Sequence, residues 1–206
     1  MSNKNPFALA ITGASGAPYA VRLLQELIRQ GERVDVMISA PGQIVLGMET
    51  SLNLPGRSAE IQRALSAHCG AAEDQLRVFG RQEWTAPLAS GSRAPRAMVV
   101  CPCTTGTLAS IAAGTSSNLI ERAADVTIKE GRKLVLVPRE TPFSVIHLEN
   151  MLRLARLGVV ILPPNPGFYQ GPSSIDDLVD FVVARILDQL GVENDLAPRW
   201  GGDECK

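Results

Sequence analysis

Short continuous apolar runs alternate along this chain with segments whose apolar residues recur every three or four positions. An apolar run of about four to eight residues is typical of a strand that helices cover on both faces, as in a parallel sheet. The run at residues 7–12 ends at a glycine, where such a strand can turn. The other runs that predict strands are residues 34–38, 97–100, 133–137 and 159–162.

The intervening segments predict helices. In residues 18–30, a proline occupies the first turn, Val21, Leu23, Leu24 and Leu27 form an apolar stripe, and Gly31 follows. Strands that alternate with helices require right-handed parallel crossovers, so the pattern predicts an α/β fold with a doubly wound parallel sheet, flavodoxin- or Rossmann-like. We expect a single α/β domain over residues 1–191 and a polar tail over 192–206. The other expected helices are residues 43–49, 58–68, 105–113, 119–130, 144–157 and 175–190.

Composition narrows the classes of protein. The chain of 206 residues has a net charge of −1 and a pI of about 6.1. It lacks the excess of basic residues that would indicate a nucleic-acid partner. No apolar run approaches the roughly 20 residues that span a bilayer, and the first residues lack a signal-peptide core. The four cysteines include Cys101 and Cys103, whose spacing fits neither a zinc site nor a redox pair. We therefore expect reduced, buried thiols in a cytoplasmic protein without a metal site.

The loop after the first predicted strand reads Gly13-Ala14-Ser15-Gly16. Its glycines allow a sharp turn, and amides at the start of the next helix attract phosphate. The G-x-x-G spacing differs from the dinucleotide fingerprint, and the second strand ends at Ser39 without an acid that could hold a ribose. The loop favours FMN over NAD, with an ordinary strand-to-helix turn as the alternative.

The loop after residues 97–100 offers hydroxyls and helix-start amides at Thr104, Thr105 and Thr107. The helix at 119–130 carries Arg122 and Lys129, seven residues apart, which one helical face can present together. Each of these cations has the alternative of simple solvation.

The segment at 135–144 brings Arg139 and Glu140 to a strand end, where parallel sheets bind ligands. A cation beside a carboxylate indicates an anionic substrate and proton transfer, or else a solvated ion pair. A stiff loop at 163–172 adds Tyr169, and Arg185 lies among apolar residues of the last helix, where an arginine either reaches solvent or meets an anion.

Five motifs of this chain resemble those of a known protein family. They are Gly13-Ala14-Ser15-Gly16-Ala17, Ile111-Ala112-Ala113-Gly114, Asn118-Leu119-Ile120-x-Arg122-Ala123-x-Asp125-Val126, Leu136-Val137-x-Arg139-Glu140-Thr141-Pro142 and Pro163-x-x-Pro166-x-Phe168-Tyr169. In this order, over residues 7–190, the chain resembles the UbiX-type flavin prenyltransferases. The loop at 101–107 departs from many relatives but keeps its donor side chains.

The resemblance implies that a dimethylallyl group passes from dimethylallyl monophosphate to N5 and C6 of reduced FMN, which closes a fourth ring. The prenylated FMN then serves a UbiD-type decarboxylase, for instance in ubiquinone biosynthesis. It also implies a metal-independent homo-oligomer, commonly a dodecamer, with the flavin at subunit interfaces.

The resemblance also assigns roles to residues. Glu140 would bind the phosphate or move a proton, Ser15 and Glu49 would relay a proton near flavin N5, and Trp84 would face the allylic cation. Fixed cations would hold the departing phosphate in place of a metal. This substrate-phosphate set is Lys129, Arg139, Tyr169 and Arg185, with Arg122 nearby. The expected FMN contacts are Gly13, Ala14, Ser15, Ser39, Thr104, Thr105, Thr107 and Arg139.

Three other functions stay open. A flavin-dependent cysteine decarboxylase would use a catalytic histidine within residues 84–95, but the histidines of this chain are His68 and His147. A flavin electron carrier would be expected to have stacked aromatics and an acidic surface, whereas this chain has 4% aromatics and a near-neutral charge. A direct aromatic-acid decarboxylase would need further carboxylate-binding groups.

Overall fold

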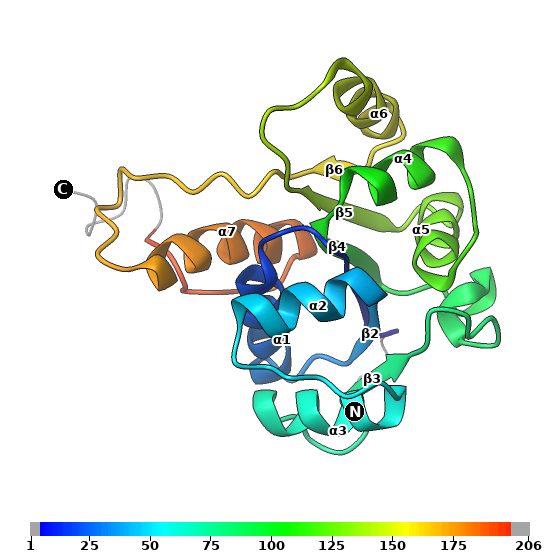
Figure 1. Ribbon diagram of the computed structural model, residues 1–206, viewed down its shortest axis with the longest axis horizontal. Helices are drawn as coiled ribbons and strands as arrows, with labels where there is room; N and C mark the ends of the chain where they lie inside the picture. Colours follow the sequence, from blue (N-terminus) through cyan, green and yellow to red (C-terminus); the bar gives the residue numbers. More distant parts are fainter. Residues whose placement is uncertain (1–4, 199–206) are drawn as a thin grey trace.

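A single parallel sheet with strand order β3-β2-β1-β4-β5-β6 forms the centre of the computed structural model, which describes residues 5–198 (Figure 1). Every pair of neighbouring strands is parallel. The doubly wound α/β fold expected from the sequence is confirmed. The strands are β1 (Phe7–Ile11), β2 (Val34–Ile38), β3 (Leu76–Phe79), β4 (Ala97–Cys103), β5 (Lys133–Pro138) and β6 (Val160–Ile161).

Helices cover both faces of this sheet (Figure 1). One face packs against α1 (Ala17–Arg29), α3 (Ser58–Cys69) and α7 (Ile175–Leu190). The other packs against α4 (Thr105–Ala113), α5 (Leu119–Lys129) and α6 (Val145–Arg156). The helix α2 (Ala40–Glu49) follows β2 directly and contributes the buried Leu46 to the first face.

The alternation of side chains along β1 explains the two layers. Phe7, Leu9 and Ile11 enter one core, whereas Ala8 and Ala10 enter the other. All five are at most 2% exposed. The small alanines let α4 and α5 approach the sheet, and burial on both faces explains why the run is continuously apolar.

The structure differs from the sequence-based expectation at four elements. The strand β4 continues to Cys103, beyond the expected end at residue 100. The strand β3 was not predicted, because it has only four residues and alternates between buried and half-buried positions. The helix α2 begins at Ala40, since the Ser39 hydroxyl accepts a hydrogen bond from Gly42 N at 3.0 Å and caps it. At the last strand, expected over residues 159–162, only Val160–Ile161 pair with β5.

The chain beyond α7 remains against the domain. Val192 is 7% exposed and belongs to the core of the first face, and Gln30 Nε2 donates to Glu193 O at 3.2 Å. The polar tail expected over 192–206 thus starts as packed chain, and its residues 199–206 lie outside the described part. None of the helices within residues 5–198 is long and apolar enough to cross a membrane.

An ion pair joins β2 and β3 at the edge of the sheet. Asp35 and Arg77 are register partners, and Arg77 Nε donates to Asp35 Oδ1 at 3.0 Å. The Asp35 side chain is 4% exposed and that of Arg77 is 43% exposed. Burial raises the pKa of Asp35, and the Arg77 guanidinium opposes this shift by stabilising the charged carboxylate.

We predict that Arg77→Met lowers the free energy of unfolding at pH 7 by about 1–3 kcal/mol, because a buried carboxylate loses its partner. A carboxyl whose folded-state pKa is raised costs stability as the pH rises from its unfolded value, near 3.9, through its folded value. Removal of the guanidinium raises the folded-state pKa of Asp35 further. The loss in the free energy of unfolding should therefore be smaller at pH 5 than at pH 7. Urea unfolding followed by circular dichroism at both pH values measures this change.

The matched control is Arg63→Met, which removes an exposed arginine on α3. It should leave stability within about 0.5 kcal/mol of the parent chain at both pH values. An Arg77→Met loss of equal size at pH 5 and pH 7 would contradict the assigned role of Asp35.

Candidate functional site

The ends of β1 and β4 are tied together where the strand order reverses. Thr12 Oγ1 donates to Pro102 O at 2.7 Å and accepts from Thr104 N at 2.9 Å. The loops that follow these two strands therefore lie side by side at the carboxyl edge of the sheet. In open α/β sheets, this switch point is where ligands bind.

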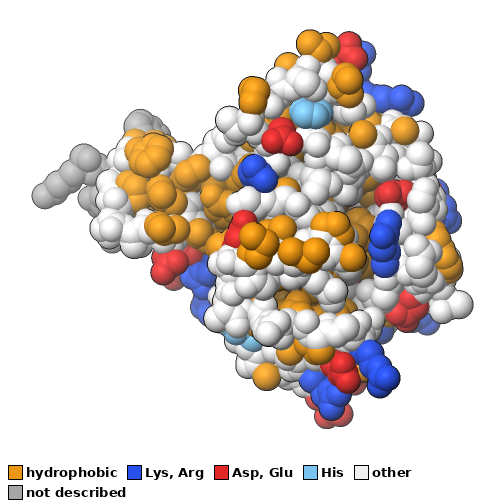
Figure 2. Space-filling model, in the orientation of Figure 1, with side chains coloured by type: hydrophobic (Ala, Val, Ile, Leu, Met, Phe, Trp, Pro, Cys, Tyr) orange, Lys and Arg blue, Asp and Glu red, His pale blue; other side chains and the backbone are white. Residues whose placement is uncertain are grey.

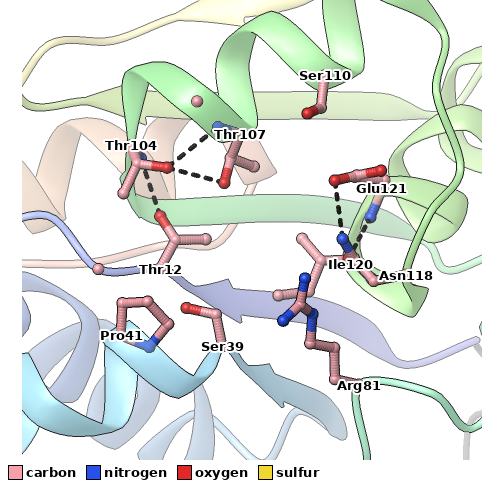
Figure 3. A pocket seen from close by; sticks show the side chains of 12 residues that line it. Thr12, Ser39, Pro41, Arg81, Thr104, Thr107, Ser110, Asn118, Ile120 and Glu121 are labelled. Atoms are coloured by element: carbon pink, nitrogen blue, oxygen red, sulfur yellow. Dashed lines mark hydrogen bonds between the residues drawn. The ribbon is translucent and has the colours of Figure 1, made fainter.

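A cavity of about 320 Å³ lies at this edge (Figure 3). It is bounded by the loops after β1, β2, β3 and β4 and by the start of α5. Its volume is at the lower end of the range of about 300–1,000 Å³ that is usual for small-molecule sites. The lining residues are Thr12, Gly13, Ser39, Pro41, Arg81, Thr104, Gly106, Thr107, Ser110, Asn118, Ile120 and Glu121.

Close backbone packing and helix caps shape this cavity. A Cβ atom at Gly13 would overlap Pro41 Cβ, so a glycine is needed where the first loop meets α2. At the start of α4, the Thr104 hydroxyl accepts from Thr107 N at 3.1 Å and donates to Thr107 Oγ1 at 2.9 Å. The first amides of a helix have no partner within the helix, so the start of α4 can bind an anion.

A carboxylate organises the glycine loop beside the cavity. Glu49 Oε2 accepts from Gly16 N at 2.8 Å and from Ala17 N at 2.9 Å. Burial acts to raise the pKa of Glu49, but hydrogen bonds from the Ser15 hydroxyl and these two amides, with the nearby Arg139 guanidinium, lower it overall. Ser15 and Glu49, to which the family resemblance gave a proton relay, are thus in hydrogen-bond contact.

Arg139 and Glu140 follow β5 at the same edge. Arg139 N donates to Cys103 O at 3.2 Å, which joins this segment to the end of β4. The side-chain Nε of Arg139 is buried and has no hydrogen-bond partner within residues 5–198. A buried guanidinium donor needs an acceptor, so this group points to a ligand with a carbonyl or anionic oxygen. Glu140 Oε1 accepts from Thr141 N at 3.2 Å.

Arg122 and Lys129 lie along α5, next to the segment at residues 87–93. Arg122 Nε donates to Ala89 O at 3.0 Å and also pairs with Asp125. Lys129 pairs with Glu130, and its Nζ would lie 2.8 Å from a Cβ atom at Gly91. One helical face does present both cations, as their spacing predicted, but neither lines the cavity.

Tyr169 lies in the segment at residues 163–174 and Arg185 lies on α7, two consecutive elements that together form an arm. The segment extends away from the sheet, and α7 packs back against the sheet's first face (Figure 1). The Tyr169 ring packs edge-on against Phe181, with centroids 5.9 Å apart, and Arg185 pairs with Asp188. Within one chain, the residues assigned to the substrate phosphate therefore form separate groups. Trp84, on the loop after β3, is 47% exposed.

Sequence reasoning assigned Gly13, Ser39, Thr104 and Thr107 to a site and missed the eight other residues that line the cavity: Thr12, Pro41, Arg81, Gly106, Ser110, Asn118, Ile120 and Glu121. Thr12 was assigned to a strand, and Pro41 was left outside a helix that starts earlier than expected. Arg81 follows β3 by two positions. The alternation of the buried Leu76 and Val78 was the available signal for that strand.

Comparison with known proteins places this chain among flavoproteins. The model of the family described as Flavoprotein matches residues 1–187. A curated relative, the flavin prenyltransferase UbiX of Pseudomonas aeruginosa, is 58% identical over 201 residues, which cover 98% of this chain and 96% of that protein.

Two solved structures are similar over nearly the whole chain. The structure of AnUbiX (PadA1) in complex with FMN and dimethylallyl pyrophosphate has a TM-score of 0.86 and 36% identity, with 97% of this chain and 99% of that chain covered. The dodecameric FMN-dependent UbiX-like decarboxylase from Escherichia coli O157:H7 has a TM-score of 0.85 and 42% identity, with 96% and 100% covered.

The contacts of Glu49 generate a prediction about stability. A carboxyl whose folded-state pKa is lowered contributes stability above its unfolded value, near 4.3, and this contribution is lost as the pH falls through the folded value. Glu49→Gln should therefore lower the free energy of unfolding at pH 7 by about 1 kcal/mol, the value of charged hydrogen bonds reduced by solvent exposure. In urea titrations, the difference in the free energy of unfolding between variant and parent should become smaller toward pH 3.5.

Glu73→Gln, at an exposed position in the turn before β3, provides the comparison for Glu49→Gln. Glu73→Gln should change the free energy of unfolding little at either pH. A constant gap for Glu49→Gln between pH 7 and pH 3.5 would mean that the charge of Glu49 does not stabilise the loop.

Proposed function

The chain belongs to the Flavoprotein family and, within it, to the UbiX flavin prenyltransferases, and we propose that it transfers the dimethylallyl group of dimethylallyl monophosphate to N5 and C6 of reduced FMN. The observation that carries this proposal is the cavity at the switch point, with the unpartnered Arg139 Nε and the adjacent Glu140 beside it. The curated relatives favour prenyl transfer over the decarboxylase and electron-carrier alternatives.

FMN fits the residues present at this site. The cavity offers the hydroxyls of Ser39 and Thr107 and the first amides of α4, which suit a phosphate and a polyol chain. The buried Nε of Arg139 suits a carbonyl oxygen of the flavin ring. When bound, reduced FMN supplies the nucleophilic nitrogen and carbon. The remaining FMN contacts in the proposal are Gly13, Ala14, Ser15, Thr104 and Thr105.

Cleavage of the allylic C–O bond leaves a phosphate that must be held by fixed positive charge. Arg122, Lys129, Arg139 and Arg185, with the Tyr169 hydroxyl, would supply charge and directed donors in place of a metal. Because α7 and α5 cover opposite faces of the sheet in one chain, we propose that these residues meet through the contributions of two or more copies to each site.

Exposed apolar side chains support a homo-oligomer. They gather over α2 and over the arm (Figure 2), where Ile44, Met48, Phe168 and Ile175 are at least 63% exposed. On α6, Val145 and Ile146 are similarly exposed. Large apolar patches of this kind mark interaction surfaces. With the dodecameric E. coli relative as precedent, we propose a dodecamer in which the flavin lies between subunits.

The other assigned residues act on protons and on the cation. Glu140 would protonate the departing phosphate or take a proton during ring closure. The hydroxyl of Ser15, bonded to Glu49, would hold a proton near flavin N5. Trp84 would present its ring face to the allylic cation. The product would serve a UbiD-type decarboxylase, and a cytoplasmic location remains a prediction.

An anaerobic incubation tests this function. Protein, reduced FMN and dimethylallyl monophosphate should yield a flavin heavier than FMN by one isoprene unit, as measured by mass spectrometry. Dimethylallyl pyrophosphate in a parallel sample identifies the preferred donor. Unchanged FMN in both samples, with flavin bound to the protein, would overturn the proposal.

We predict that Glu140→Gln still binds FMN but forms ring-closed product at least a hundredfold more slowly, because general acid–base catalysis is typically worth 10²–10⁴-fold and an amide cannot transfer the proton. Stopped-flow absorbance of the flavin measures FMN binding, and the mass of the released flavin measures formation of the ring-closed product. Glu149→Gln, an exposed change on α6, is the control. Turnover of Glu140→Gln at the parent rate would leave Glu140 with only an orienting role.

A further inference from the structure

Arg81 is a cation in the cavity to which neither the sequence nor the family resemblance gave a role. It follows β3 and extends into the cavity between Ser39 and the start of α5 (Figure 3). Arg81 O accepts from Leu119 N at 2.8 Å, so its backbone is fixed to α5. Arg81 is an exposed residue, and within residues 5–198 its guanidinium forms no hydrogen bond or ion pair. It is therefore available to a ligand.

The nearest acidic group on the cavity wall is already committed to other donors. Glu121 Oε1 accepts from Asn118 Nδ2 at 2.7 Å, and Glu121 Oε2 accepts from Ser117 N at 2.8 Å. Thr115 Oγ1 also donates to Oε2, at 3.2 Å. Glu121 thus holds the loop before α5, and Arg81 supplies the cavity's unpaired cation among the described residues.

The donors near Arg81 have the character of a phosphate site. The same cavity is lined by Gly106 and Thr107 at the start of α4, and by Ser39 at the start of α2. The amides at these two helix starts and the rotatable side-chain hydroxyl groups are neutral donors. Arg81 adds the positive charge that a phosphate dianion requires. The arginine and the helix starts are independent observations that favour the same ligand chemistry.

The size of the cavity decides which part of FMN it can hold. At about 320 Å³ it accommodates the phosphate and polyol chain more readily than a whole flavin. The ring would then lie toward Ser15, Glu49 and Arg139, outside the lining residues but in contact with Gly13. Arg81 and Arg139 would thus bind opposite ends of the molecule.

We propose that Arg81 binds the phosphate of FMN and is the residue by which this protein distinguishes FMN from riboflavin. The inference rests on the proposed function, since it assumes that FMN occupies the cavity. Arg81 acts in binding and takes no part in the transfer of the prenyl group.

Titrations of the full-length protein with oxidised FMN and with riboflavin, followed by flavin fluorescence, test this role. Arg81→Met should weaken FMN binding about tenfold to a hundredfold, as expected for loss of charged hydrogen bonds. Riboflavin binding should change by less than twofold. Arg81→Lys should recover part of the FMN affinity as a point charge, and inorganic phosphate should compete with FMN less well in Arg81→Met.

Arg63→Met is the control for lost surface charge, and thermal unfolding of each variant confirms that it folds. An Arg81→Met variant that binds FMN as the parent does, or that loses FMN and riboflavin equally, would overturn the assignment. A parent protein that binds neither flavin would instead overturn the proposed function, so the two failures are distinguishable.

Discussion

The hydroxyl of Thr12 joins the two strands on which the site depends. It donates to the carbonyl of Pro102 and accepts from the amide of Thr104 at the sheet's switch point, where Thr12 and Pro102 are buried and Thr104 is half-buried. One side chain thereby sets the spacing between the glycine loop and the threonine loop. Every ligand contact proposed at this edge assumes that spacing, because the two loops form adjacent walls of one cavity.

Around Thr12, the acidic side chains are bonded to backbone amides, and two arginine side chains keep donors that can contact a ligand. Glu49 and Glu121 each satisfy backbone amides at helix or loop starts, so their negative charge is compensated by fixed donors. The Nε of Arg139 has no hydrogen-bond partner within the described chain, and no described residue forms a hydrogen bond or ion pair with the Arg81 guanidinium. The cavity therefore presents net donor capacity to an anion, although the whole chain is nearly neutral.

The sequence predicted the central strands well because each is buried on two faces and is therefore continuously apolar, as at Phe7–Ile11. It missed β3, where an edge position exposes alternate side chains and weakens the pattern. That omission concealed Arg81, since a residue can be assigned to the carboxyl edge only if its strand is recognised. The family resemblance named Tyr169 and Arg185, but a single sequence does not encode which copy supplies each residue.

The separation between the arm and α5 has a genetic consequence. If each site combines α5 of one copy with the arm of another, a chain defective at Arg185 and a chain defective at Lys129 carry lesions in different halves of the site. A mixed assembly of the two contains some sites in which both contributed halves are intact. Two inactive alleles in one cell would then restore activity to each other, as interallelic complementation, while each alone remains null.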